Sequence, residues 1–139
     1  MVNRKELDNY CNEYLNVTAF KDYCQNGLQI EGTENITSIV SGVSANLALI
    51  ERAIDEKADA IFVHHGIFWK DEDQAITGAK RRKVSLLLSH NINLFSYHLP
   101  LDAHPEVGNN VQLGKLLDIK NMKPVEGSLL WQGDLNISL

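Results

Sequence analysis

Three short apolar segments alternate with two helix-like segments along the middle of the chain, and this alternation constrains the fold more than any other feature. The apolar segments are residues 36–43 (ITSIVSGV), 60–63 (AIFV) and 92–98 (INLFSYH). Segments 45–58 and 78–91 lie between them and are predicted helices. Strands that alternate with helices in this way predict an α/β fold, with a mostly parallel sheet flanked by helices on both faces.

Further elements are expected on either side of this alternating region. Ser44 is the predicted N-cap of the helix over 45–58, and Gly108, Asn109 and Asn110 are predicted to cap a helix that ends near Leu117. A helix over 4–16, an extended piece at 28–30, and strands and turns over 122–139 complete the prediction. A length of 139 residues favours one α/β domain over residues 1–139.

Composition and charge exclude several classes of protein. The net charge of −5 argues against a general nucleic-acid binder, because phosphate binding needs an excess of Lys and Arg. No apolar run approaches the ~20 residues that span a bilayer, and the charged N-terminus lacks a signal-peptide core. We therefore expect a cytoplasmic protein without a membrane partner. Cys11 and Cys24 are expected to be reduced and to act as small buried hydrophobes.

Histidines stand at the ends of two predicted strands. His64 and His65 follow the second apolar segment directly, and His98 ends the third. The carboxyl ends of parallel strands meet at one edge of a sheet, which is where sites form in α/β proteins. Asp102 follows four residues after His98, and Pro100 between them predicts a loop instead of a helix.

His64, His65, His98 and Asp102 together form a candidate metal site. Nitrogen and oxygen ligands without a thiolate suit Zn, Fe, Mn, Co or Ni. Neighbouring side chains on a strand point to opposite faces, so His64 and His65 are expected to diverge and to serve two ions. Two ions about 3.5–4 Å apart, bridged by Asp102, would form a recurring hydrolytic arrangement. The alternative is a pair of hydrogen-bonded core histidines, which the addition of His98 and Asp102 disfavours.

Other residues allow a functional and a structural interpretation. His104 is either a ligand or proton shuttle or a surface loop residue, and His90 is expected to interact with a helix C-terminus. The basic residues 80–83 form either a solvated helix face or an anion contact. Phe68 and Trp69 could stack on a planar base, or pack in the core or at an oligomer contact.

Three stretches of the chain resemble a known family. NGLQIEG, ADAIFVHHGIFWK and HLPLDAHPEVGNN are similar to the dinuclear-metal family of GTP cyclohydrolase type 2 homologues, also called the Ngg-interacting-factor-three-like family. The likeness runs from about Tyr10 to Trp131 and is strongest to bacterial, YbgI-type members. It implies an α/β fold, two divalent metal ions per subunit, toroidal homohexamers, and metal binding by His64, His65, His98 and Asp102, with Asp102 as the bridge.

The resemblance also includes one departure. Members of the family are longer and complete the metal site with a His-x-x-x-Glu pair near their C-terminus. No histidine follows His104 in this chain, so nothing in it matches that pair. We therefore expect the chain to correspond to the N-terminal portion of a longer family protein.

Two functions remain open from the sequence. The first is a metal-dependent hydrolase that uses metal-activated water on GTP or an ester, with His104 as the nearest candidate general acid and the substrate undefined. The second is a non-catalytic metal-binding interaction or adaptor protein that forms a ring. A ring that encircles DNA gains no support from the net charge of −5.

Overall fold

The computed structural model describes residues 1–135. It falls into two compact units, an N-terminal unit over Met1–His98 and a C-terminal unit over Leu99–Leu139. Each unit is described by itself below. The single domain expected over residues 1–139 stays a prediction.

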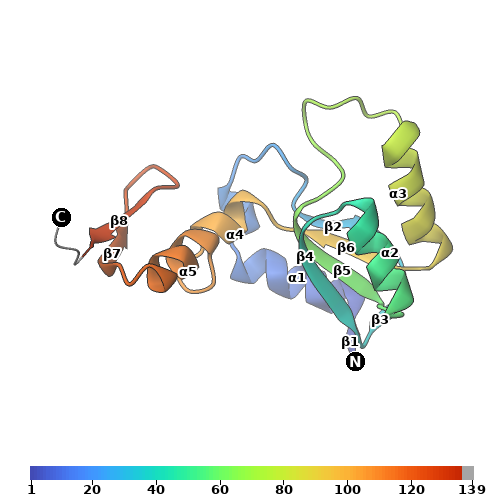
Figure 1. Cartoon of the computed structure of the whole chain (residues 1–139), viewed down its shortest axis with the longest axis horizontal. Coiled ribbons are helices and arrows are strands. Elements are labelled where there is room, and N and C mark those ends of the chain that lie inside the picture. Colours follow the sequence, from blue (N-terminus) through green and yellow to red (C-terminus); the bar gives the residue numbers. More distant parts are fainter. Residues whose placement is uncertain (136–139) are drawn as a thin grey trace. The chain divides into compact units, whose positions relative to one another are not determined.

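A four-stranded sheet forms the centre of the N-terminal unit (Figure 1). Its strands lie in the order β2 (Gly27–Ile30), β6 (Asn93–Ser96), β5 (Ala60–His65) and β4 (Ile39–Ser44). The pairings β4–β5 and β5–β6 are parallel, whereas β2 pairs with β6 in the antiparallel sense. The predicted mostly parallel sheet is therefore confirmed, with an antiparallel strand at one edge.

Two helices cover one face of this sheet. They are α2 (Leu47–Asp55) and α3 (Gly78–Ser89). Both strands and helices contribute to one apolar cluster, because alternate residues of a strand point to the same face. The fully buried members of this cluster are Ile50, Ala53, Ile61, Leu87 and Leu94.

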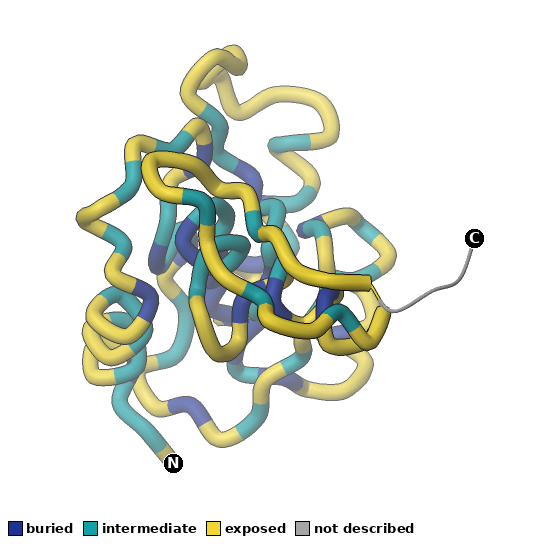
Figure 2. The backbone as a smooth tube through the Cα atoms, turned by 90° about the vertical axis from the view of Figure 1, so that its left-hand side faces the viewer, coloured by how far each residue is buried: buried dark blue, intermediate teal, exposed yellow. Residues whose placement is uncertain are grey.

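The opposite face of the sheet is aromatic and is covered by α1 (Arg4–Tyr14). Phe62 stacks on Phe95 and Tyr97, with ring centroids 6.1 and 5.1 Å away. The Tyr97 hydroxyl donates a hydrogen bond of 3.3 Å to Asp8 of α1. Helices on both faces, as predicted, bury β6 over its whole length. Figure 2 colours the backbone by burial, with the buried residues in dark blue.

Shorter elements complete the N-terminal unit. The strand β1 (Val2–Asn3) pairs with β3 (Asn35–Ile36), and a single 3-10 turn, η1 (Val17–Ala19), follows α1. The predicted helix over 4–16 and the extended piece at 28–30 are therefore confirmed within a residue or two. On α1, Tyr10 and Tyr14 stack on each other at the surface and do not face the core.

The C-terminal unit contains two helices followed by a hairpin. The helices are α4 (Leu99–Ala103) and α5 (Asn109–Leu116), and the hairpin joins β7 (Lys120–Pro124) to β8 (Trp131–Asp134). The predicted strands over 122–139 are confirmed as far as Asp134, and residues 136–139 lie outside the described residues.

The structure corrects two local predictions and narrows a third. Asn46, not Ser44, caps α2, because its side chain accepts from the Leu49 backbone amide at 2.9 Å while Ser44 still belongs to β4. Within the predicted cap of α5, Gly108 is the N-cap, and Asn109 and Asn110 lie in the first turn of the helix. The segment after His98 is helical, because the first turn of a helix tolerates Pro100, whose missing amide has no partner there in any case.

Among residues 1–135, no helix combines the length and apolar character that crossing a membrane requires.

Candidate metal centre

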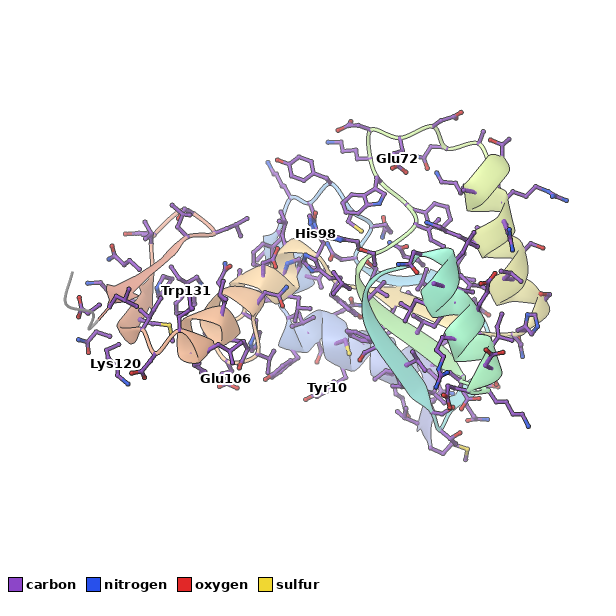
Figure 3. All side chains as sticks on the ribbon, in the orientation of Figure 1. Tyr10, Glu72, His98, Glu106, Lys120 and Trp131 are labelled. Atoms are coloured by element: carbon purple, nitrogen blue, oxygen red, sulfur yellow. The ribbon has the colours of Figure 1, made fainter. Side chains whose placement is uncertain are left out.

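His64, His65 and His98 come together at one end of the central sheet. Each offers one ligand atom, and the three atoms lie within 4.8 Å of one another. The ring centroid of His64 lies 4.5 Å from that of His65 and 4.8 Å from that of His98. His98 is labelled in Figure 3. The prediction that the ends of β5 and β6 gather these histidines at one edge is therefore correct.

The expected divergence of His64 and His65 is wrong. The parallel pairing of β5 with β6 ends at Val63 and Ser96, whereas the pairing with β4 continues to His65. Within the described part of the chain, the last two residues of β5 therefore border β4 on one side and no strand on the other. Strand alternation fixes the direction of the Cβ atoms, but the two imidazole rings lie next to each other at the end of β5, with centroids 4.5 Å apart.

A hydrogen bond at Nδ1 orients each of the three rings. The Nδ1 atom of His64 lies 3.1 Å from the Tyr97 carbonyl oxygen, and that of His65 lies 3.0 Å from the Ser44 hydroxyl. The Nδ1 atom of His98 lies 2.8 Å from a carboxylate oxygen of Asp22. Bonds of this kind commonly fix the tautomer and direction of metal-binding histidines, with Nε2 as the ligand atom.

Tyr97 links this site to the interior of the sheet. Its carbonyl contacts His64, while its buried ring stacks on Phe62 and its hydroxyl donates to Asp8. Burial raises the pKa of the Tyr97 phenol far above its usual value, and the nearby Cys11 and Asp8 add to this effect. Tyr97 therefore stays protonated and serves as a fixed hydrogen-bond donor.

Trp69 lies against the histidines because its segment pairs with residues 23–25. Cys24 and Trp69 form an isolated antiparallel bridge, with hydrogen bonds from the amide of Gln25 to the carbonyl of Phe68 and from the amide of Lys70 to the carbonyl of Tyr23. The Trp69 ring lies 5.2 Å from the His98 ring and 5.8 Å from the His65 ring. The indole is thus one apolar side of the histidine cluster.

An open cavity of about 500 Å³ adjoins the cluster. It shares Asp22 and Trp69 with the surroundings of His98, and its other lining residues are Tyr23, Cys24, Gln25, Phe68, Lys70 and Gln74. Its volume lies within the range of small-molecule pockets, which is about 300–1,000 Å³. A second hollow, in the C-terminal unit, is lined by apolar and amide side chains without histidine, cysteine or carboxylate.

The remaining predicted site residues lie in the C-terminal unit or on the surface. Asp102 belongs to α4, and its carboxylate accepts a hydrogen bond of 2.8 Å from the side-chain amide of Asn109. The role of Asp102 as a metal ligand stays a prediction. The His104 ring accepts from the amides of residues 106 and 107, which is a turn-stabilising contact. His90 caps the C-terminus of α3, as predicted.

The basic residues and the cysteines have structural surroundings. Lys80 lies over the Phe68 ring at 5.5 Å and donates to the Asp73 carbonyl, and Arg82 pairs with Glu51 at 3.2 Å. These contacts agree with a solvated helix face. Both Cys11 and Cys24 are thiols outside any disulfide, and Cys24 is buried.

Asp22 and Ser44 contact the histidine rings, although the sequence did not predict either of them as a site residue. Ser44 pairs with His65 across β4 and β5, so the strand register could have revealed it. Asp22 lies 76 residues before His98, in an irregular segment without periodic pattern. The one available signal was its place shortly before the NGLQIEG stretch.

Comparisons with known proteins agree with this picture. A sequence model of Duf34/NIF3 (NGG1p interacting factor 3) matches residues 2–139. The GTP cyclohydrolase 1 type 2 homolog of Yersinia pestis is 52% identical over 134 residues, which cover 96% of this chain and 54% of that protein. This chain therefore spans about half the length of the curated relatives that it matches.

Two solved structures are similar over most of the chain. Protein ybgI, of unknown function, superimposes with a TM-score of 0.93 at 47% identity, over 98% of this chain and 55% of that one. TTHA1606 from Thermus thermophilus superimposes with a TM-score of 0.85 at 38% identity, over 90% of this chain and 52% of that one. Both comparisons agree with the α/β arrangement described above.

Proposed function

Because this chain belongs to the Duf34/NIF3 (NGG1p interacting factor 3) family, we propose that it contributes the histidine part of a metal-dependent hydrolase. The reaction class follows the relatives named GTP cyclohydrolase 1 type 2 homolog. The observation that carries the proposal is the set of three imidazoles whose ligand atoms lie within 4.8 Å.

The donor set of the cluster fits a divalent metal ion. Imidazole nitrogens are ligands for Zn, Fe, Mn, Co and Ni, and three of them are sufficient for a catalytic zinc site. Each ring has its Nδ1 atom next to an oxygen atom of the protein, which leaves Nε2 as the nitrogen that would bind the ion. His64, His65 and His98 would hold it, and Asp102 is the fourth ligand predicted from the sequence.

An ion bound by these residues supplies Lewis-acid activation of water, which hydrolysis requires. The chain itself contributes orientation and shielding. Tyr97, Ser44 and Asp22 hold the rings, while the Trp69 indole covers His65 and His98 and limits the access of solvent.

The cavity next to the cluster is the proposed substrate site. Trp69 and Phe68 offer aromatic surface, and Gln25, Gln74 and Lys70 offer polar groups around it. Such a lining suits a planar ring with hydrogen-bonding edges, as in a purine nucleotide. This agrees with GTP as the compound to test first.

Formate release from GTP by the metal-loaded chain tests the proposal. We expect turnover that a chelator abolishes and that His65→Asn lowers at least about 100-fold, since mutation of a group that acts in the reaction removes several kcal/mol. His90→Asn is the matched control, because His90 caps α3 at the surface. A panel of phosphate and carboxylate esters extends the same assay.

The absence of turnover on GTP and on every ester, both for this chain and for a relative of full length such as the Yersinia pestis protein, would reject the hydrolase. If His65→Asn then changed only stability or assembly, the metal-binding adaptor would replace it. The homo-oligomeric ring expected from the family resemblance is part of both functions.

A further inference from the structure

We propose that Asp22 positions His98 for metal binding, by holding the proton of the ring on Nδ1 and thereby presenting Nε2 as the ligand atom. The inference rests on the metal-binding function proposed above, but the state of the His98 ring can be measured without a metal. Asp22 was not among the predicted site residues.

The contact between the two side chains is short and shielded from water. Asp22 Oδ1 lies 2.8 Å from His98 Nδ1, and the side chains are 3% and 15% exposed. A carboxylate only accepts hydrogen bonds, so the neutral ring must carry its proton on Nδ1 to form this bond. The lone pair then remains on Nε2, and the adjacent negative charge makes that nitrogen a better ligand.

Asp22 is itself held in one orientation. Its Oδ1 atom accepts from the backbone amides of Tyr23 and Cys24 at 2.6 and 3.1 Å, and its Oδ2 atom accepts from the Asn26 side-chain amide at 2.9 Å. Asn26 also accepts from the His98 backbone amide at 2.8 Å. The segment from Asp22 to Asn26 therefore holds His98 at both its backbone and its ring.

The other two rings have neutral partners at Nδ1. His64 lies next to the Tyr97 carbonyl, and His65 lies next to the Ser44 hydroxyl, which can donate or accept. Of these three Nδ1 partners, Asp22 is the one that carries a charge. Loss of Asp22 is therefore expected to affect metal binding more than loss of the Ser44 hydroxyl.

Asp22→Ala tests the inference, with Asp59→Ala as the matched control. Asp59 also accepts from two successive backbone amides, those of Thr37 and Ser38 at 2.7 and 3.0 Å, so both variants remove a carboxylate that fixes a turn. The two readouts on the full chain are zinc affinity, by competition with a chromogenic chelator, and the ring tautomers, by ¹⁵N NMR of the metal-free protein. Both measurements are made at a pH of about 8.

We expect zinc affinity to fall about 10- to 100-fold in Asp22→Ala and to stay unchanged in Asp59→Ala. In the metal-free wild-type chain, the His98 signals should show the proton on Nδ1. In Asp22→Ala, a measurable fraction should carry it on Nε2, whereas Asp59→Ala should resemble wild type.

Two results would overturn the inference: unchanged zinc affinity in Asp22→Ala, or a His98 proton on Nε2 in the wild-type chain. The second needs no variant, so it decides the question even if Asp22→Ala does not fold. A wild-type chain that binds no zinc would instead reject the proposed function. The tautomer of His98 would then still show whether Asp22 sets the state of the ring.

Discussion

The glycine that follows the two histidines is the most informative place to perturb the site. Gly66 is buried, and a Cβ atom added there would lie 2.3 Å from Oε1 and 2.4 Å from Nε2 of Gln29. These distances are far below van der Waals contact, so Gly66→Ala must displace the Gln29 amide. That amide joins two segments, because it accepts from the Ile67 backbone amide at 2.8 Å and donates to the Gln25 carbonyl at 2.6 Å.

The expected cost of Gly66→Ala has two parts. Displacement of Gln29 leaves the amide of Ile67, a residue only 4% exposed, without its partner, which costs about 1–3 kcal/mol. Forcing the Gln29 side chain out of its packed position adds about 1–3 kcal/mol of strain. The free energy of unfolding should therefore fall by about 2–6 kcal/mol, a large part of the about 5–15 kcal/mol of a typical domain.

Urea unfolding followed by circular dichroism measures this cost in a double-mutant cycle. Gln29→Ala alone should cost about 1–3 kcal/mol, because it removes the partner of Ile67. Once the Gln29 amide is gone, the added methyl group has room, so Gly66→Ala in the Gln29→Ala background should cost less than about 1 kcal/mol.

Two outcomes would refute this reasoning. One is a Gly66→Ala variant destabilised by less than about 0.5 kcal/mol, which is the range of neutral surface substitutions. The other is a double variant whose loss equals the sum of the two single losses, because the clash with Gln29 would then not be the cause.

Three further predictions concern stability and assembly. Hydrogen bonds from Thr37 lower the pKa of Asp59, so this carboxylate stabilises the fold at neutral pH and the stabilisation is lost as the pH falls below about 4. The difference in free energy of unfolding between wild type and Asp59→Ala, measured in urea, should therefore shrink over that range. A difference that stays constant would contradict this prediction. Leu87→Ala should lower the free energy of unfolding by about 2–5 kcal/mol, because Leu87 is fully buried. Leu116 is 84% exposed, so Leu116→Ala should change the same free energy by less than about 0.5 kcal/mol. Equal effects of the two variants would show that the core is wrongly placed. Light scattering after size-exclusion chromatography should find a homo-oligomer, and a monomer at all concentrations would reject the ring.

The sequence predicted which histidines share an edge because topology alone decides it. Once β5 and β6 are parallel neighbours, His64, His65 and His98 must emerge at the same end of the sheet. The apolar segments and their alternation with helices were sufficient for this step, since the spacing of apolar residues and the length of a segment distinguish strands from helices.

The sequence did not predict how the rings meet, because alternation along a strand gives the direction of the Cβ atoms and not the rotation of the rings. The centroids of His64 and His65 lie 4.5 Å apart at the end of β5. Asp22 was missed for a related reason: its contact with His98 joins an irregular loop to a strand end 76 residues away. The sequence does not predict α4, because proline breaks the interior of a helix and only its position in the first turn makes Pro100 compatible with one.

Metal content per chain is the most direct test of the central claim, which is that His64, His65 and His98 bind a divalent ion. The chain would be incubated with zinc, passed over a desalting column and measured by inductively coupled plasma mass spectrometry, beside His98→Asn and the control His90→Asn. We predict about one zinc ion per chain for wild type and for His90→Asn, and a large loss for His98→Asn, because three imidazoles are the minimum set of a stable site. Equal zinc content in His98→Asn and wild type, or none in either, would contradict the account.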